Sequence, residues 1–255
     1  MNVPVNKFII TCFFVFCFAL QHTAVSGQTL KVAIAANLQP VIKALQADFK
    51  TKTRISTDAI SGASGKLTAQ IKNGAPFDVF LSADVAFPAD LFKTGFATKA
   101  PVVYADGVLI MCSTRKLGAQ PWARLLTSPG VKRVAIANPS IAPYGKAAAE
   151  ALTHEGILKK MNGKLVTGES ISQVNTYIST GVVDAGFTTL SFYKENSGKQ
   201  QLNMWTINPK TYSPIQQGMI ILKHGAGKAA AQQFYKYILS PAAKKIFIKY
   251  GYHVQ

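Results

Sequence analysis

Four residues stand at the predicted starts of helices and carry the chemistry that this chain can offer: Asn37, Ser64, Tyr144 and Ile171. A helix start leaves backbone N–H groups without intrahelical partners and carries the positive end of the helix dipole, so it attracts anions. Asn37, Ser64 and Tyr144 add amide and hydroxyl side chains, and Ile171 offers its backbone N–H. These residue types favour binding an anion through uncharged donors.

Each of these residues also has an ordinary structural interpretation. Asn37 and Ser64 are common helix-capping residues, and Tyr144 suits an ordinary aromatic in the loop 139–145. Ser170, which precedes Ile171, forms a capping box with Gln173. The binding interpretation therefore depends on finding four starts of one kind in a single chain.

Sequence motifs for catalysis and nucleotide binding are incomplete. The segment 61–67 resembles the end of a phosphate loop, but Leu67 replaces the hydroxyl residue that would reach magnesium. The histidines after residue 100 are scattered and lack metal-ligand spacing. Asp78 and Asp84 flank one short predicted strand, and Asp78 suits a turn and capping residue better than a general base. The sequence thus favours a binding protein over an enzyme.

The charge balance is strongly basic, with 28 Lys and Arg against 11 Asp and Glu and a formal net charge of +17. Such a balance favours anionic partners. The basic residues do not cluster, and the densest group is Lys244, Lys245 and Lys249. We expect no nucleic-acid partner, because the chain is predicted to be exported.

Residues 1–27 have the composition of a signal peptide. Lys7 precedes the apolar run 8–20, and small and polar residues follow at 24–27. The run is shorter than the roughly 18–20 residues that cross a membrane. After cleavage Cys112 is the one remaining cysteine, so no intramolecular disulfide is expected. We predict a soluble, exported, monomeric protein.

Strands and helices alternate after residue 28, which predicts an α/β fold. The predicted strands cover residues 30–35, 55–60, 79–82, 108–112, 134–137, 185–189 and 215–222. The predicted helices cover residues 38–50, 65–73, 86–94, 144–154, 171–179, 227–239 and 241–250. Such units form mostly parallel sheets flanked by helices, and ligands gather beyond the carboxyl ends of the strands.

The chain has no long linker, so two lobes would have to be joined by strands that pass between them. The best crossing points lie just before residue 108 and at 212–214. We predict a discontinuous first lobe of residues 28–105 plus 213–255 and a second lobe of residues 106–212. The ligand would lie in the cleft between them.

Several segments resemble the periplasmic molybdate-binding proteins of bacterial ABC importers, over residues 30–252. The run Gly-Ala-Pro-x-Asp-x-Phe-x-Ser-Ala-Asp at 74–84 is the most specific of them. The others are residues 35–38, 61–67, 71–73, 138–148, 186–191 and 249–252. The resemblance implies the type II periplasmic-binding-protein fold, with two lobes that close on a bare tetrahedral oxyanion.

The resemblance also implies which residues touch the ligand. They are Asn37, Ser64, Tyr144 and Ile171, the last through its backbone N–H. Relatives with serine and alanine at the places of Asn37 and Tyr144 take their phenol from a tyrosine at the place of Thr189. This chain resembles the other branch, so Thr189 is a less certain contact. No catalytic residue, cofactor or directly bound metal is implied, because molybdenum is bound as its oxyanion.

The expected function is to capture molybdate, and also tungstate, and to deliver it to the membrane permease of an ABC importer. Two alternatives remain: a binding protein for sulfate or another tetrahedral oxyanion, or an enzyme acting on a small anionic substrate. A site built only of donors disfavours phosphate, which keeps a proton near neutral pH and needs an acceptor. Glu169 is the one acid near a proposed contact, and we expect it to point away from the cleft.

Overall fold

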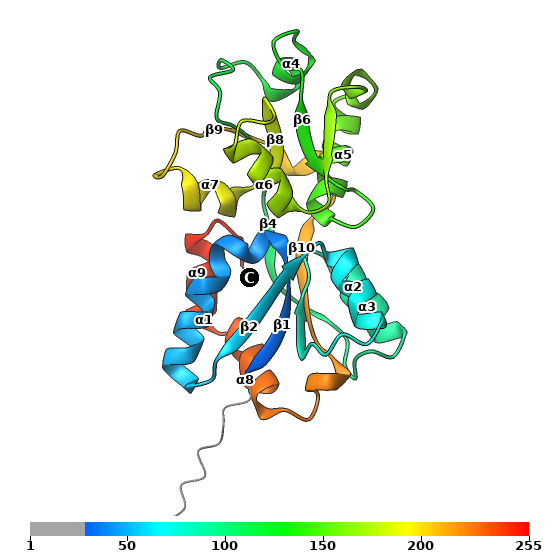
Figure 1. Ribbon diagram of the computed structural model, residues 1–255, viewed down its shortest axis with the longest axis vertical. Coiled ribbons are helices and arrows are strands. Elements are labelled where there is room, and N and C mark those ends of the chain that lie inside the picture. The colour runs from blue at the N-terminus through cyan, green and yellow to red at the C-terminus, as the bar shows by residue number, and fades with distance from the viewer. Residues whose placement is uncertain (1–28, 255) are drawn as a thin grey trace, which may run out of the picture.

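The structure is a computed structural model that describes residues 29–254. Two five-stranded sheets, each with its own helices, are stacked along the long axis of the molecule (Figure 1). The predicted signal peptide, residues 1–27, lies outside the described residues. Within residues 29–254, no helix combines the length and apolar character needed to cross a membrane.

The first sheet has the strand order β2-β1-β3-β10-β4, and β10 runs antiparallel to both of its neighbours. Its strands are β1 (Leu30–Ala35), β2 (Thr57–Gly62), β3 (Val79–Leu81), β4 (Val102–Gly107) and β10 (Ile215–Ile221). The helices of this half are α1 (Gln39–Thr53), α2 (Ser64–Lys72), α3 (Ala86–Lys93), α8 (Ala229–Ile238) and α9 (Pro241–Lys249).

The second sheet repeats this plan with the order β7-β6-β8-β5-β9, and β5 is the reversed strand. Its strands are β5 (Leu109–Ser113), β6 (Val134–Ala137), β7 (Leu165–Gly168), β8 (Ala185–Thr189) and β9 (Asn203–Thr206). Its helices are α4 (Trp122–Thr127), α5 (Pro143–His154), α6 (Ile171–Ser179) and α7 (Leu190–Asn196). Short 3-10 helices cover Ala36–Leu38 (η1), Leu158–Met161 (η2), Pro209–Thr211 (η3) and Lys223–Gly225 (η4).

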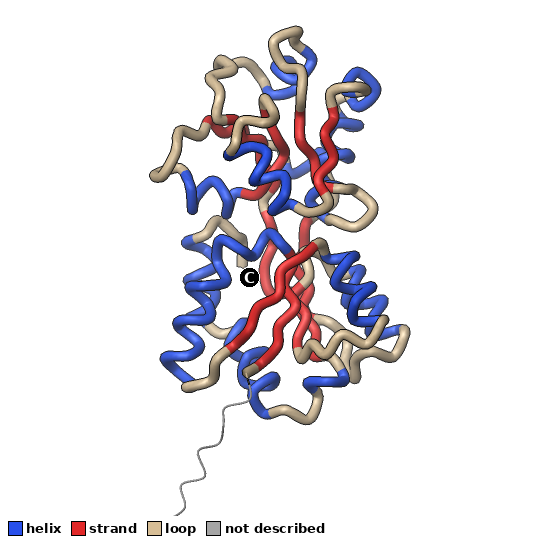
Figure 2. Tube along the Cα trace, viewed as in Figure 1, coloured by secondary structure: helices blue, strands red, loops and turns tan. Residues whose placement is uncertain are grey.

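Helices cover both faces of the first sheet, and Figure 2 shows helices on either side of its strands. Along β1, Val32 and Ile34 pack in the core cluster that includes α1, α8 and α9. Ala33 between them packs with α2 and α3. This alternation is the two-residue period of a strand, and it explains why β1 reads as a continuous apolar run.

The chain passes between the two sheets twice, from β4 to β5 and from β9 to β10. Only Val108 separates β4 from β5, so the first crossing is a nearly continuous strand. The expected α/β architecture, with two mostly parallel sheets flanked by helices, is confirmed. The crossings place the carboxyl ends of β1, β2 and β6 where the two halves meet (Figure 1).

All seven predicted strands are present, but the pattern missed β4, β7 and β9 and the helices α4 and α7. The three missed strands share one property, since each lies at the edge of its sheet. Edge strands bury less of their surface, so their residues mix polar and apolar types without a clear period. The half-exposed residues of β7 and β9 illustrate this.

The Asp78 carboxylate forms a buried ionic contact in the first sheet. It lies at the end of β3 that is remote from the contact between the two halves. It is fully buried, and it accepts hydrogen bonds from Lys228 Nζ at 2.7 Å, His224 Nδ1 at 2.8 Å and the Lys31 backbone N–H at 2.9 Å. Burial raises the pKa of Asp78, but the bonds from Lys228, Lys31 and His224 outweigh it and lower the pKa below its usual value. Asp78 therefore ties β1 to the segment before α8, a larger role than the predicted turn.

Replacing Lys228 by methionine is expected to lower the free energy of unfolding by about 1–3 kcal/mol at pH 7, because it strips a partner from a buried charge. The contribution exists while Asp78 is ionised, so the difference from wild type should shrink as the pH falls below about 4. Urea unfolding at pH 7 and pH 3.5 measures it. Lys236→Met, an exposed change on α8, is the matched control. A loss at pH 7 no larger than the control's would contradict this role.

Candidate functional site

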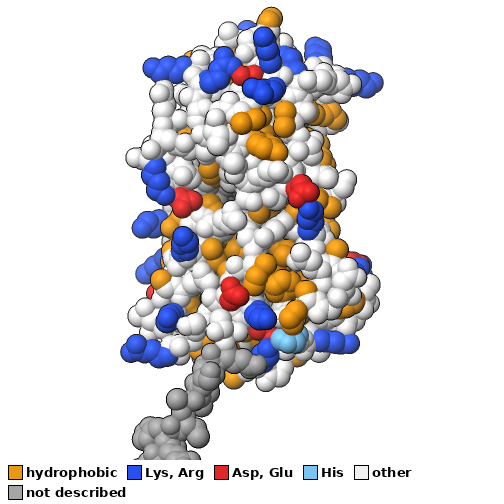
Figure 3. All heavy atoms as spheres, in the orientation of Figure 1, with side chains coloured by type: hydrophobic (Ala, Val, Ile, Leu, Met, Phe, Trp, Pro, Cys, Tyr) orange, Lys and Arg blue, Asp and Glu red, His pale blue; other side chains and the backbone are white. Residues whose placement is uncertain are grey.

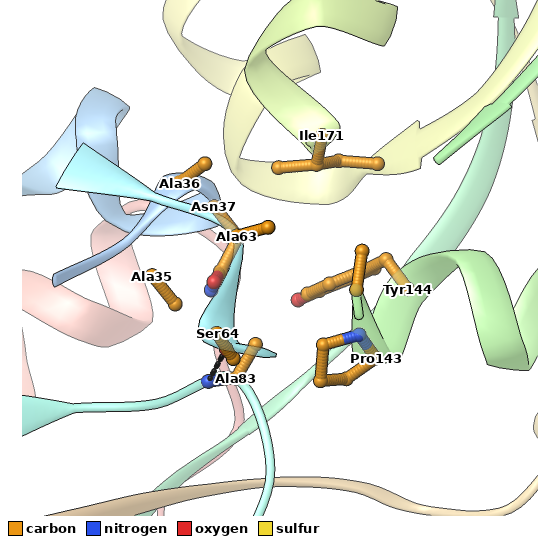
Figure 4. A pocket seen from close by; sticks show the side chains of 10 residues that line it. Ala35, Ala36, Asn37, Ala63, Ser64, Ala83, Pro143, Tyr144 and Ile171 are labelled. Atoms are coloured by element: carbon orange, nitrogen blue, oxygen red, sulfur yellow. Dashed lines mark hydrogen bonds between the residues drawn. The ribbon is translucent and has the colours of Figure 1, made fainter. Parts of the chain in front are cut away.

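A small hollow lies where the two halves meet, and its free space is about 200 Å³ when the part open to solvent is counted. Residues of both halves line it, and Figure 4 shows their side chains converging. The lining consists of Ala35, Ala36, Asn37, Ala63, Ser64, Ala83, Ala142, Pro143, Tyr144 and Ile171. All four residues predicted to touch a ligand from the sequence are among them, and small alanines supply most of the remaining wall.

Ser64 is the first residue of α2 and is buried. Ala63 precedes the helix, so Ser64 does not cap it as the ordinary interpretation would have it. Its hydroxyl oxygen accepts the Ala83 backbone N–H at 3.1 Å, a bond drawn in Figure 4. Because the oxygen is anchored in this way, the hydroxyl proton is available to a ligand in the hollow.

Tyr144 lies in the first turn of α5, directly after Pro143. Its phenol is buried, and among residues 29–254 the hydroxyl has no hydrogen-bond partner. In Figure 4 the hydroxyl points from α5 toward Asn37 and Ser64. Burial, together with the nearby Tyr252, Tyr104 and Tyr212, raises its pKa well above 10. The phenol thus stays protonated at neutral pH and is a buried donor without an acceptor, which costs free energy until a ligand arrives.

Asn37 lies in η1 and caps neither η1 nor α1. Its amide nitrogen donates to Gln217 Oε1 at 2.8 Å and to the Tyr252 hydroxyl at 3.1 Å. Its Oδ1 is buried and has no hydrogen-bond partner in the part of the chain that the structure describes. The structure thus differs from the expectation that this amide donates to a ligand, since both of its N–H bonds are used inside the protein.

Gln217 explains this orientation of Asn37. The Gln217 Nε2 donates to the carbonyl oxygens of Ala83 and Ile215, both at 3.2 Å, so its Oε1 is left to face Asn37. The Tyr252 hydroxyl completes the arrangement by donating to the Asn37 carbonyl at 2.8 Å. Gln217 was not predicted as a site residue from the sequence, although a glutamine inside the mostly buried strand β10 is the kind of residue that marks a buried polar contact.

Ile171 is the first residue of α6, so its backbone N–H lies outside the intrahelical ladder. Ser170 caps this helix as predicted, because its side chain accepts the Gln173 N–H at 3.4 Å. The return bond of the capping box is shifted by one residue, since Gln173 Oε1 accepts the Glu169 N–H at 2.6 Å. The helix start is therefore held firmly against the hollow.

Thr189 is not part of the lining. Its buried hydroxyl caps α7 by accepting the Phe192 N–H at 3.0 Å, and it lies 2.9 Å from the Ser191 hydroxyl. The neighbouring Thr188 hydroxyl bonds the Asn175 side chain. These contacts give both threonines structural roles at the end of β8.

The two halves touch beside the hollow at the start of α2. The Gly65 N–H donates to the Ile141 carbonyl at 2.9 Å. The Lys66 Nζ lies 2.6 Å from Glu169 Oε2, and this ion pair is largely exposed. Glu169 thus forms its ion pair outside the hollow. This agrees with the expectation that its side chain points away from the cleft.

The hollow is lined by hydroxyl and backbone donors and by Asn37, whose Oδ1 is an acceptor, and by no charged side chain. Between residues 29 and 254, no three His, Cys, Asp or Glu side chains gather as metal ligands would. A nucleophile with an adjacent base is also missing from the lining. The arrangement suits holding a small anion and offers no general acid or base to transform one.

Two α/β halves, joined by two strand crossings and closing on a small hollow, define a binding protein of the two-lobed type II fold. A family model for bacterial extracellular solute-binding proteins matches residues 30–253. The chain therefore belongs to the family of bacterial extracellular solute-binding proteins, and it is a transport-associated binding protein, not an enzyme.

Individual relatives place the chain further within this family. It is 36% identical over 230 residues to the molybdate-binding protein ModA of Rhodobacter capsulatus, covering 90% of this chain and 89% of that protein. It is 33% identical to the molybdate-binding protein ModA of Azotobacter vinelandii, covering 91% and 92%. The solved structure of the Azotobacter vinelandii periplasmic molybdate-binding protein superposes with a TM-score of 0.84 at 34% identity, covering 89% of this chain and 99% of that one.

Proposed function

We propose that the protein captures molybdate in the hollow between its halves and delivers it to the membrane permease of an ABC importer. The observation that carries the proposal is the buried, unpartnered Tyr144 hydroxyl, which shares one small hollow with Ser64, Asn37 and Ile171. The similarity to molybdate-binding proteins supports the choice of ion.

The energetics of such a site are those of a buried dianion. Removing a compact dianion from water is costly unless its oxygens find donors. The Ser64 and Tyr144 hydroxyls and the backbone N–H groups near residues 37, 64, 144 and 171 supply them. Each hydrogen bond to a charged group contributes roughly 1.5–3 kcal/mol. About six of them, less the cost of closing the halves, give the roughly −8 to −12 kcal/mol of micromolar to nanomolar binding.

The size of the hollow limits the ligand class. Pockets for drug-sized ligands have volumes of about 300–1,000 Å³, and the free space of this hollow stays below that range, at about 200 Å³, even when its part open to solvent is counted. A bare five-atom oxyanion suits it better than a sugar or a peptide. Tungstate has nearly the size of molybdate, and we propose that it binds as well, whereas sulfate is smaller and would leave donors unpaired.

We propose further that the protein acts as an exported, periplasmic monomer and binds no nucleic acid. Residues 28–105 plus 213–255 would form one lobe and residues 106–212 the other. The two strand crossings, β4 to β5 and β9 to β10, support this division into lobes, with β4 carrying the first sheet on to Gly107. The lobes would close on the ion and open at the permease, and the ion can leave easily because no salt bridge to it must break.

Calorimetry on protein cleared of bound ion, with molybdate, tungstate, sulfate and phosphate, tests the proposal. Molybdate at 100 times its dissociation constant should also raise the stability by roughly 2.7 kcal/mol, which a thermal melt detects. Absence of both heat and stabilisation with molybdate would refute the proposed ligand. Tighter sulfate than molybdate binding would favour the sulfate alternative.

Phosphate is expected to bind much more weakly than molybdate, because it keeps a proton near neutral pH and the site offers mainly donors. Asn37 Oδ1 is the one unpartnered acceptor among the four side chains. Comparable phosphate and molybdate affinities would contradict the expectation and would show that a proton of phosphate is accepted there. Titrating phosphate into wild type and into Asn37→Ala separates these outcomes, since such an acceptor role would vanish in the variant.

A further inference from the structure

Gly107 ends β4 at the first strand crossing, where it pairs with Ile215 of β10. Its φ is not among the positive values that favour glycine, so the backbone conformation does not require glycine here. The surroundings do require it. A Cβ built on Gly107 would lie 2.1 Å from the Tyr144 hydroxyl oxygen, 2.9 Å from its Cζ and 2.9 Å from Gln217 Nε2, so the phenol is the nearest group. The hydroxyl that lines the hollow therefore rests directly on the crossing strand.

Tyr144 cannot retreat from that strand by moving its helix. A Cβ built on the adjacent Gly145 would lie 2.1 Å from the Ala137 carbonyl oxygen, so the start of α5 is pressed against the end of β6. The phenol is thus held between the crossing strand on one side and the hollow on the other. A side chain at position 107 therefore competes for space first with the Tyr144 hydroxyl, and the side open to the phenol is the hollow that it lines.

We propose that Gly107 is a specificity-determining residue that sets the size of the ion accepted, by fixing how far the Tyr144 hydroxyl stands back from the hollow. The inference rests on the proposed binding of a tetrahedral oxyanion. Gly107 touches no ligand itself and acts through Tyr144, so it is a positioning residue. Its effect must therefore depend on the phenol and must differ between large and small ions.

The test compares wild type, Gly107→Ala, Tyr144→Phe and the double variant by calorimetry with molybdate and sulfate. Gly107→Ala should weaken molybdate binding at least tenfold and sulfate binding at most threefold, because the narrowed hollow penalises the larger ion. Tyr144→Phe lacks the hydroxyl oxygen, the atom nearest to position 107. In this background, Gly107→Ala should lower the logarithm of the molybdate affinity by less than half as much as it does in wild type. Equal losses for both ions, or equal losses in both backgrounds, would overturn the inference.

Thermal unfolding of the same kind of variants tests the contact between Gly107 and Tyr144 without any ligand. Gly107→Ala should lower the melting temperature. Adding Tyr144→Ala, which removes the phenol that the new methyl group would clash with, should restore part of the loss. If Gly107→Ala does not fold, the variant with both changes should fold, and failure of both overturns the inference. A wild type that binds sulfate but not molybdate refutes the proposed ligand alone, while this stability comparison still decides the role of Gly107.

Discussion

Removing the hydroxyls of Ser64 and Tyr144 together is expected to weaken molybdate binding by at least about 100-fold. Each hydroxyl would donate one hydrogen bond to a charged ligand, worth roughly 1.5–3 kcal/mol, or about a 10- to 100-fold change in affinity. The Tyr144 hydroxyl has no partner among the described residues 29–254, so Tyr144→Phe removes the donor without breaking any bond seen there. Calorimetry with molybdate on Ser64→Ala, Tyr144→Phe and the double variant measures the losses.

The two single variants should differ in the ligand-free protein. Tyr144→Phe removes a buried donor without a partner and should leave the free energy of unfolding unchanged or slightly raised. Ser64→Ala leaves the buried Ala83 N–H without its acceptor and should lower it by about 1–3 kcal/mol. The controls are Ser140→Ala and Tyr177→Phe, which lie outside the lining. Affinities of the double variant within threefold of the controls would rule out the proposed contacts.

The architecture could be predicted from the sequence because each interior strand is a buried apolar run that a helix follows. Such local patterns survive in the folded protein, as β1, β6 and β8 show with their predicted bounds. Three of the four edge strands, β4, β7 and β9, could not be predicted in this way, because partly exposed strands mix polar and apolar residues; the fourth, β2, was predicted. The helix starts at Ser64 and Ile171 could also be predicted, because the residues next to them in the sequence determine where each helix begins.

The side-chain contacts of the site were less predictable, because they join residues far apart in the chain. The bond between Asn37 and Gln217 spans 180 residues, and no local pattern encodes it. Asn37 looks like a cap or a donor from its neighbours alone, but Gln217 and Tyr252 decide where its amide points. Gly107 is another example, since the reason for its glycine lies in Tyr144.

Gly65 is a further residue whose role depends on a contact with a distant part of the chain. Replacing it gives the second prediction with a large expected effect. Its position beside Ser64 suggests only that little bulk separates a ligand from the backbone. In the structure, a Cβ built on Gly65 would lie 3.0 Å from both Cα and Cβ of Ile141 in the other half. Its φ is not positive, so glycine is present here to allow close approach of the two halves.

Gly65→Val is therefore expected to hold the halves apart and to weaken molybdate binding by at least about 100-fold. A held-open protein loses the donors of Tyr144 and Ile171, each worth roughly 1.5–3 kcal/mol, and also the bond from the Gly65 N–H to the Ile141 carbonyl. The fold itself should survive, because the clash arises between the halves and not within either one. Small-angle scattering should show wild type contracting on addition of molybdate and the variant keeping its ligand-free dimensions.

Lys66→Met provides the comparison that separates steric closure from charge at the same contact. Its ion pair with Glu169 bridges the halves one residue away, but both side chains are largely exposed, so the pair contributes about 0.2–1 kcal/mol. Lys66→Met should thus cost at most about fivefold in affinity and should leave the contraction intact. If Gly65→Val bound molybdate as tightly as Lys66→Met does, close approach of the two halves at Ile141 would not be needed for binding. The donors of one half would then have to bind the ion without those of the other half.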